Sequence, residues 1–97
     1  MKLRFEWDLA KAASNRRKHG VSLETATRVF VDPYALVEQD RIENGEERWL
    51  AIGVVEGSWM LTVAHVVYEH DQIETIRIIS ARRADRTERR RYEEANG

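Results

Sequence analysis

The sequence predicts an α+β fold with a short N-terminal strand, two helices, a four-stranded antiparallel meander and a C-terminal helix. Three observations lead to this prediction. Capping residues frame two helical segments between residues 8 and 33, apolar runs separated by turns fill residues 34–81, and a highly charged helical segment follows. The 97 residues contain one proline and no repeat, so we expect a single domain over residues 1–97.

The N-terminal third begins with a short predicted strand over residues 3–7. Asp8 is a good N-cap for the first helix, and Gly20 suits the left-handed residue that ends it. Four consecutive basic residues, 16–19, complement the negative end of the helix dipole. The apolar positions of this helix are Leu9, Ala12 and Ala13.

A second helix is predicted to begin after Ser22, which caps it, and to stop at the Asp32-Pro33 pair. Its apolar stripe consists of Leu23, Ala26, Val29 and Phe30. We expect the first and second helices to cover one face of the sheet together.

The central region has the period of β-strands over residues 35–39, 48–55, 59–68 and 74–81. Turns are expected at residues 43–45, 56–58 and 70–72, so consecutive strands should pair antiparallel. The last helix, residues 85–95, is expected to cover half of the second face. The uncovered half would form a groove, where we expect the functional site.

Composition limits the kind of protein. A chain of this length buries only roughly 60–65% of its unfolded surface, so any active site must be shallow. There is no cysteine, which excludes disulfides and thiolate catalysis and suits a reducing compartment. The N-terminus has charges throughout and no apolar run of signal or membrane-spanning length. We therefore expect a soluble cytoplasmic protein that makes no membrane contact.

The charges are segregated along the chain, although the net charge is only −1. Residues 1–20 hold six Lys and Arg against two acids, residues 21–76 hold three against eleven, and residues 77–97 hold seven against four. A nucleic-acid surface would therefore require the two basic ends to meet in space, with the acidic middle facing elsewhere.

Candidates for RNA cleavage without a metal can be named from the residues alone. Such cleavage needs a base for the ribose 2′-hydroxyl, cations for the phosphate and an acid for the departing 5′-oxygen. His19, beside Lys18, and Glu47 are candidate bases, and three arginines could hold the scissile phosphate: Arg48, Arg77 and Arg82. Arg83, Arg86 and Tyr92 are candidate RNA-binding residues. No cofactor is expected.

Each candidate also has a structural interpretation. His19 could simply satisfy the last carbonyls of its helix, and Arg77 could be a partly buried cation paired with Glu74 or Asp8. The arginines of the last helix alternate with glutamates, which is typical of a solvated, ion-paired face. The three tryptophans are expected in the core: Trp7, Trp49 and Trp59.

A metal site is not expected. His65 and His70 lie five residues apart on an extended chain, which would point them to opposite faces. No cysteine or acid follows them at ligand spacing.

Five stretches occur in order over nearly the whole chain. They are Phe5–Asp8, Lys18–Ser22, Asp32–Pro33, Glu47–Trp49, and Arg77–Ala84 followed by Glu88 and Tyr92. None is specific alone, but together they resemble the BrnT family of toxins from bacterial toxin–antitoxin pairs.

This resemblance implies a RelE-like fold and an endoribonuclease that arrests growth by cutting RNA. It also implies a neutralising partner, a BrnA-like ribbon-helix-helix antitoxin, and contact with operator DNA only through the toxin–antitoxin complex. The alternative is a module that binds protein or nucleic acid without catalysis.

Overall fold

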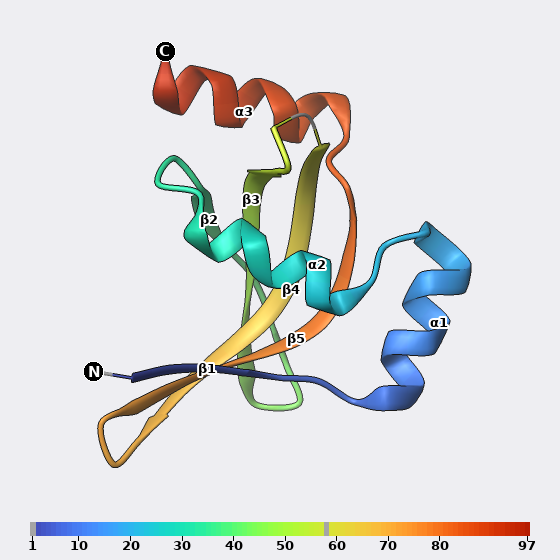
Figure 1. Ribbon diagram of the computed structural model, residues 1–97. Coiled ribbons are helices and arrows are strands. Elements are labelled where there is room, and N and C mark those ends of the chain that lie inside the picture. The colour runs from blue at the N-terminus through green and yellow to red at the C-terminus, as the bar shows by residue number, and fades with distance from the viewer. Residues whose placement is uncertain (1, 58) are drawn as a thin grey trace.

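The computed structural model describes residues 2–57 and 59–97, and this part of the chain forms one sheet with helices around it (Figure 1). The strands are β1 Lys2–Glu6, β2 Leu36–Glu43, β3 Glu46–Val55, β4 Trp59–His70 and β5 Ile73–Arg83. The helices are α1 Leu9–His19, α2 Leu23–Ala26, the 3-10 helix η1 Thr27–Val31, and α3 Arg86–Asn96. The predicted order of elements is confirmed.

The sheet has the strand order β1-β5-β4-β3-β2. Strands β2 to β5 form the predicted antiparallel meander. The first strand, which sequence reasoning left unplaced, pairs parallel with β5 from Lys2 opposite Ile73 to Glu6 opposite Arg77. The sheet therefore has five strands, and its N-terminal strand lies beside its C-terminal one.

The turns between the strands depend on backbone with positive φ. Asn44 and Gly45 have φ values of 53° and 79°, so the β2–β3 hairpin uses the dipeptide that favours a type I′ turn. Asp71 and Gln72 join β4 to β5 with φ values of 51° and 64°. The expected turn at 56–58 is described only as far as Gly57, because Ser58 lies outside the described residues.

The second helix differs from the prediction because its C-terminal half is a 3-10 helix. Ser22 accepts a hydrogen bond from the Thr25 N–H as predicted, but the α-helical part ends at Ala26. Four of the residues from 25 to 31 are β-branched, which disfavours the α-helix. The tighter η1 lies directly on β3 at Gly53, where an added Cβ would be 2.9 Å from Val29 Cγ1.

The first helix does not cover a face of the sheet, and this part of the prediction was wrong. The α1 helix lies beyond the outer edge of β5 (Figure 1). Leu9 is 80% exposed and Ala13 is exposed, so of the expected apolar positions Ala12 alone packs against the core. The buried residue of the helix is polar Asn15.

Asn15 fixes α1 by completing the edge of β5. Its side-chain oxygen accepts from the Ala81 N–H at 3.0 Å, and its amide nitrogen donates to the carbonyls of Ala81 and Val21, both at 2.9 Å. Since β1 pairs only as far as Arg77, these bonds satisfy backbone groups that the edge strand would otherwise leave unpaired. The Asn15 side chain thus makes the two hydrogen bonds to Ala81 that a neighbouring strand would otherwise make.

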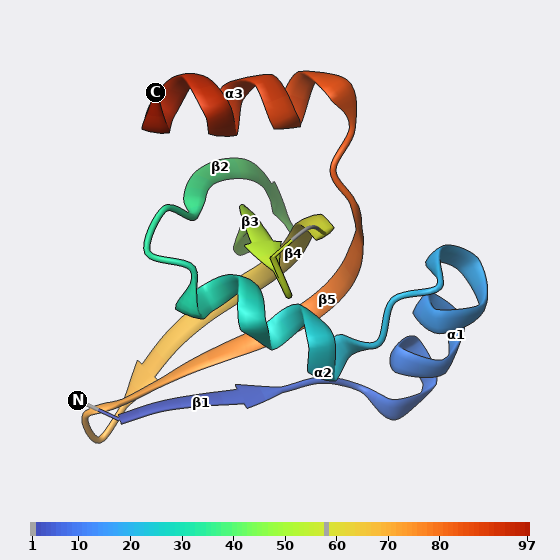
Figure 2. The ribbon, with the colours of Figure 1, turned by 45° about the horizontal axis from the view of Figure 1, so that its top comes forward.

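The two faces of the sheet have unequal cores, and Figure 2 shows the strands between α2 and α3. The larger core lies under α2 and η1, and it includes Leu23, Val29, Leu61 and Ile78. The smaller core lies under α3 and consists of Ile52, Met60 and Ala84 with partly buried Leu36, Val54 and Tyr92. Within the described residues, no helix combines the length and apolar character needed to cross a membrane.

Candidate functional site

The candidate site residues are divided among three places on the sheet. Cross-strand pairs put Arg82 with Thr62, Ser80 with Ala64, and Arg77 with Val66 on the face that α3 partly covers. Lys18 and His19 lie on α1, at the outer edge of β5. Glu47 lines a hollow at the far end of β4. Among the hollows formed by residues 2–57 and 59–97, none contains all six predicted catalytic residues.

Arg82 anchors α3 to the sheet. Its two terminal nitrogens donate to both carboxylate oxygens of Glu88, at 2.7 and 2.9 Å. Glu88 is 4% exposed and also accepts from the Thr62 hydroxyl at 2.9 Å and from the Asp85 N–H at 2.9 Å. The hydrogen bonds from Arg82 are the main cause that lowers the pKa of Glu88 to about 2, and the same bonds raise the pKa of Arg82.

The other predicted phosphate ligands are also paired with carboxylates. Arg77 contacts Glu46 at 2.7 Å, and not Glu74 or Asp8. Arg48 contacts Glu43 at 2.7 Å and keeps its Nε buried without a hydrogen-bond partner among the described residues. A phosphate at either arginine would have to compete with an anion already in place.

Lys18 and His19 line a hollow of about 330 Å³ between α1 and β5. Lys11 is a third basic lining residue, and Ser80 lies opposite on β5. No carboxylate lines this hollow among the described residues. Arg82 follows Ser80 by two residues on the same face of β5, so its half-exposed guanidinium is the next cation along the strand. This hollow is suited to an anion.

Glu47 lines a hollow of about 700 Å³ at the opposite end of β4. Glu46 and Glu74 are two further acids in its lining, beside the aromatic side chains of Trp49 and Tyr68. Tyr68 donates a hydrogen bond to Glu6, which together with burial raises the pKa of the phenol. Two of these three acids have no cationic partner within the described parts of the chain, and this end of the sheet is therefore acidic.

The Tyr92 hydroxyl is used in a hydrogen bond within the protein. Its hydroxyl donates to Asp32 Oδ2 at 2.8 Å, and burial followed by this bond raises the pKa of Tyr92 to about 12. Burial raises the pKa of Asp32, but hydrogen bonds from the N–H groups of Val54 and Tyr34 and from Tyr92 lower it more. The carboxylate thus links η1, β3 and α3, which explains the Asp32-Pro33 pair structurally.

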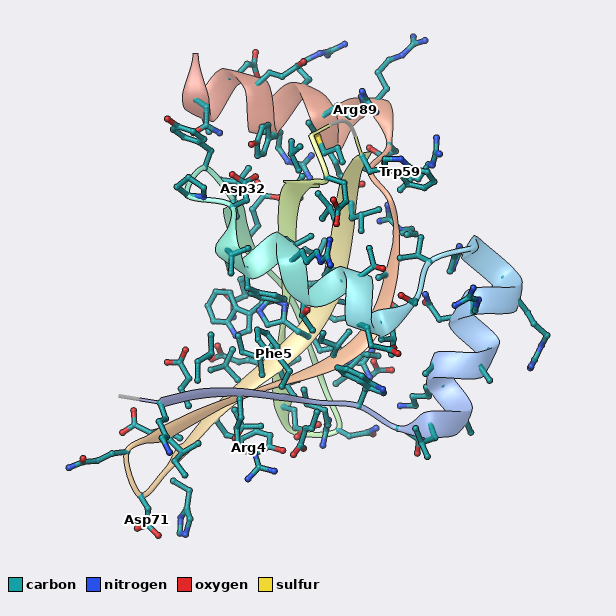
Figure 3. The ribbon with its side chains drawn as sticks, in the orientation of Figure 1. Arg4, Phe5, Asp32, Trp59, Asp71 and Arg89 are labelled. Atoms are coloured by element: carbon teal, nitrogen blue, oxygen red, sulfur yellow. The ribbon has the colours of Figure 1, made fainter. Side chains whose placement is uncertain are left out.

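Trp59 was wrongly expected in the core. It is 45% exposed, and the guanidinium carbon of Arg83 lies 3.9 Å from the centre of its ring. Figure 3 shows Trp59 beside Arg89 near the N-terminal end of α3, far from Asp71 at the other end of the sheet. The signal that could have indicated its exposure is its position directly after a glycine turn, at the first residue of a strand.

The fold and its edges define a small α+β protein with one basic edge and one acidic end. Residues 7–88 match the family model described as ribonuclease toxin, BrnT, of type II toxin–antitoxin system. The chain therefore belongs to the BrnT family of ribonuclease toxins, and this membership implies a cognate antitoxin.

Comparison with solved structures supports the same fold. The 1.1 Å crystal structure of the Brucella abortus ribonuclease toxin, BrnT, matches with a TM-score of 0.69 and 23% sequence identity, over 88% of this chain and 100% of that chain. At this identity the likeness shows the fold alone. A comparison with curated proteins gives no match.

Proposed function

We propose that this toxin is a metal-independent endoribonuclease that acts in the cytoplasm and arrests growth by cutting RNA at the hollow between α1 and β5. The observation that carries the proposal is the lining of that hollow, where Lys11, Lys18 and His19 face Ser80 and no described acid intervenes. A polyanion is attracted to such a surface, and salt weakens that attraction.

The proposed reaction needs no metal because the nucleophile is part of the substrate. The 2′-oxygen attacks the neighbouring phosphorus while the bond from phosphorus to the 5′-oxygen breaks. The departing 5′-oxygen takes a proton from solvent water, which leaves a 2′,3′-cyclic phosphate and a 5′-hydroxyl. His19, which lines the hollow beside Lys18, takes the 2′-hydroxyl proton as the general base. Lys18 stabilises the charge on the phosphorane, and Arg82 contributes only if the phosphate competes with Glu88 for its guanidinium.

Glu47 is the second candidate base. It lines the hollow of about 700 Å³, where Trp49 and Tyr68 offer aromatic surface to a nucleobase, and Arg77 is nearby in an ion pair with Glu46. The three acids around it oppose phosphate binding, so we favour His19. Arg48 contributes to this second site only if the phosphate displaces Glu43.

The partner is proposed to be a BrnA-like ribbon-helix-helix antitoxin that neutralises the toxin, with operator DNA bound only by the complex. The membership of this chain in a family of type II toxin–antitoxin toxins supports this proposal. Expression of the chain alone should slow growth, and co-expression with the adjacent reading frame should restore it. Equal growth of both strains would contradict the toxin role.

The cleavage itself is tested with purified protein and unstructured RNA in EDTA. Fragments with 2′,3′-cyclic ends are the expected products. RNA that is retained without being cut would instead favour a non-catalytic binding module, and cleavage that requires added divalent metal would contradict the proposed mechanism.

A further inference from the structure

Trp59 forms a flat exposed platform with Arg83. Arg83 pairs across the sheet with Leu61, which follows Trp59 by two residues on the same face of β4. Arg83 is therefore the diagonal neighbour of Trp59, a distance that long and aromatic side chains span. Its guanidinium lies over the ring, 3.9 Å from the centroid, while 45% of Trp59 stays exposed.

Two hollows meet at this indole. One, of about 270 Å³, lies toward α1 and is bordered by Arg16, Ser22 and Thr25. The other, of about 80 Å³, lies toward α3 and is bordered by Arg83 and Arg89. Arginines from α1, β5 and α3 thus line the hollows on the two sides of one aromatic side chain. The basic ends of the chain meet here.

These arginines differ from those on the sheet because their charges are not neutralised. Arg16, Arg83 and Arg89 have no ion pair within residues 2–57 and 59–97, whereas six other arginines do: Arg28, Arg41, Arg48, Arg77, Arg82 and Arg91. The one acid that borders the larger hollow, Glu56, is paired with Arg28. The platform therefore keeps a net positive charge.

We propose that the Trp59–Arg83 platform binds an unpaired RNA base by stacking, with Arg16 and Arg89 holding the phosphates on either side. A nucleobase stacks on an aromatic ring or a guanidinium plane without regard to its identity, and cations beside it follow the backbone. Bases in a duplex are already stacked and paired, so the surface selects single-stranded segments.

This inference rests on the proposed function and adds the class of substrate. Arg16 belongs to the same last turn of α1 as Lys18 and His19, and Arg83 follows Arg82 on β5. Arg82 and Arg83 point to opposite faces of β5, so a strand held on the platform reaches the hollow where cleavage is proposed by passing around the last turn of α1. The platform positions RNA and takes no part in proton transfer.

The test is binding of a short 2′-O-methyl oligouridine, which cannot be cut because its 2′-oxygens are blocked. An abasic strand of the same length and charge reports the phosphate contribution alone. Trp59→Ala should weaken binding of the oligouridine by roughly 5- to 150-fold, the range of one base stack, and leave the abasic strand unaffected. Trp59→Phe should retain most of the affinity.

Tyr34→Ala is the matched control, because Tyr34 is 62% exposed and lies in a different hollow. Its RNA affinity should equal that of the unchanged protein. Thermal unfolding of each variant separates loss of binding from loss of folding, and Trp59→Phe keeps the test valid should the alanine variant be unstable.

Three outcomes would overturn the inference. If Trp59→Ala binds both strands as the unchanged protein does, the platform is wrong while the ribonuclease proposal stands. If Trp59→Ala weakens only neutralisation by the antitoxin, the surface belongs to a protein partner. If the unchanged protein binds neither strand and cuts no RNA, the proposed function fails as well.

Discussion

The two ends of β4 differ in charge although both carry exposed aromatic side chains. At its first residue, Trp59 lies among arginines that have no ion pair among the described residues, and the hollow of Lys18 and His19 lies beyond the neighbouring edge of β5. At its last third, Tyr68 lies among Glu46, Glu47 and Glu74. A phosphate chain is attracted to the first end and repelled by the second.

The difference teaches that the number of arginines is a poor guide to an RNA surface. The face of the sheet carries Arg48, Arg77 and Arg82, yet each is held by a glutamate at 2.7 Å. The cations that the proposal uses, Lys18 on α1 and Arg89 near the start of α3, have no ion pair among the described residues. Pairing, more than composition, decides where a polyanion can bind.

The strongest test of the comparison replaces one candidate base at each end. His19→Ala should lower the rate of RNA cleavage by about 10²–10⁴-fold, the usual contribution of general acid–base catalysis. Glu47→Gln should leave the rate nearly unchanged. Single-turnover cleavage with cyclic-end detection measures both, and the opposite ranking of the two variants would move the catalytic centre to the acidic end.

The next largest effect concerns stability at the basic end. Glu88→Ala should lower the free energy of unfolding by about 2–4 kcal/mol, because it leaves Arg82, Thr62 and the Asp85 N–H without their buried partner. Urea unfolding measures the loss. Glu74→Ala, at the acidic end and without an ion pair among the described residues, is the matched control and should cost less than about 0.5 kcal/mol.

Acid should remove part of the same stabilisation. The pKa of Glu88 falls from an ordinary value of 4.5 to about 2 on folding, so its contribution is complete above about pH 4.5 and is lost as the pH falls toward 2. With allowance for the partial exposure of Arg82, the loss is about 2 kcal/mol. Unfolding at several pH values should show this slope, and Glu88→Gln should flatten it. An unchanged slope would assign the acid sensitivity to other groups.

The smallest expected effect is on salt-dependent RNA binding. Lys18→Gln should reduce the slope of log affinity against log salt by about 0.7, the value of one phosphate contact on a single strand. Glu74→Gln should leave the slope unchanged and raise affinity by no more than about twofold, since the acid is screened from a strand bound at the other end. Equal slope changes would mean that RNA covers both ends.

Local signals predicted most of the fold. Asp8 and Ser22 cap their helices through the expected hydrogen bonds, and Gly20 adopts the left-handed conformation. These features depend on neighbours in the sequence, which is why the sequence alone reveals them. The antiparallel meander followed from its short turns in the same way.

The sequence could not predict features that join distant residues. Nothing in the sequence near Asn15 indicates that its side chain bonds to the backbone of Ala81. We therefore expected α1 to pack on a face of the sheet through its apolar residues. Arg82 and Glu88 are separated by a helix cap, and their shared burial with Thr62 depends on strand register. The exposure of Trp59 depends on which end of the sheet the helices leave open.

The bond from Asn15 to β5 has a consequence for inhibition. A protein that pulled α1 away would expose the backbone of residues 78–83 as an open strand edge, with the Ala81 N–H and carbonyl unsatisfied. An added β-strand could satisfy both groups while it separated the two sides of the proposed cleavage site. The Asn15 side chain, which joins α1 to β5, is therefore the contact that an inhibitor of this kind would have to break.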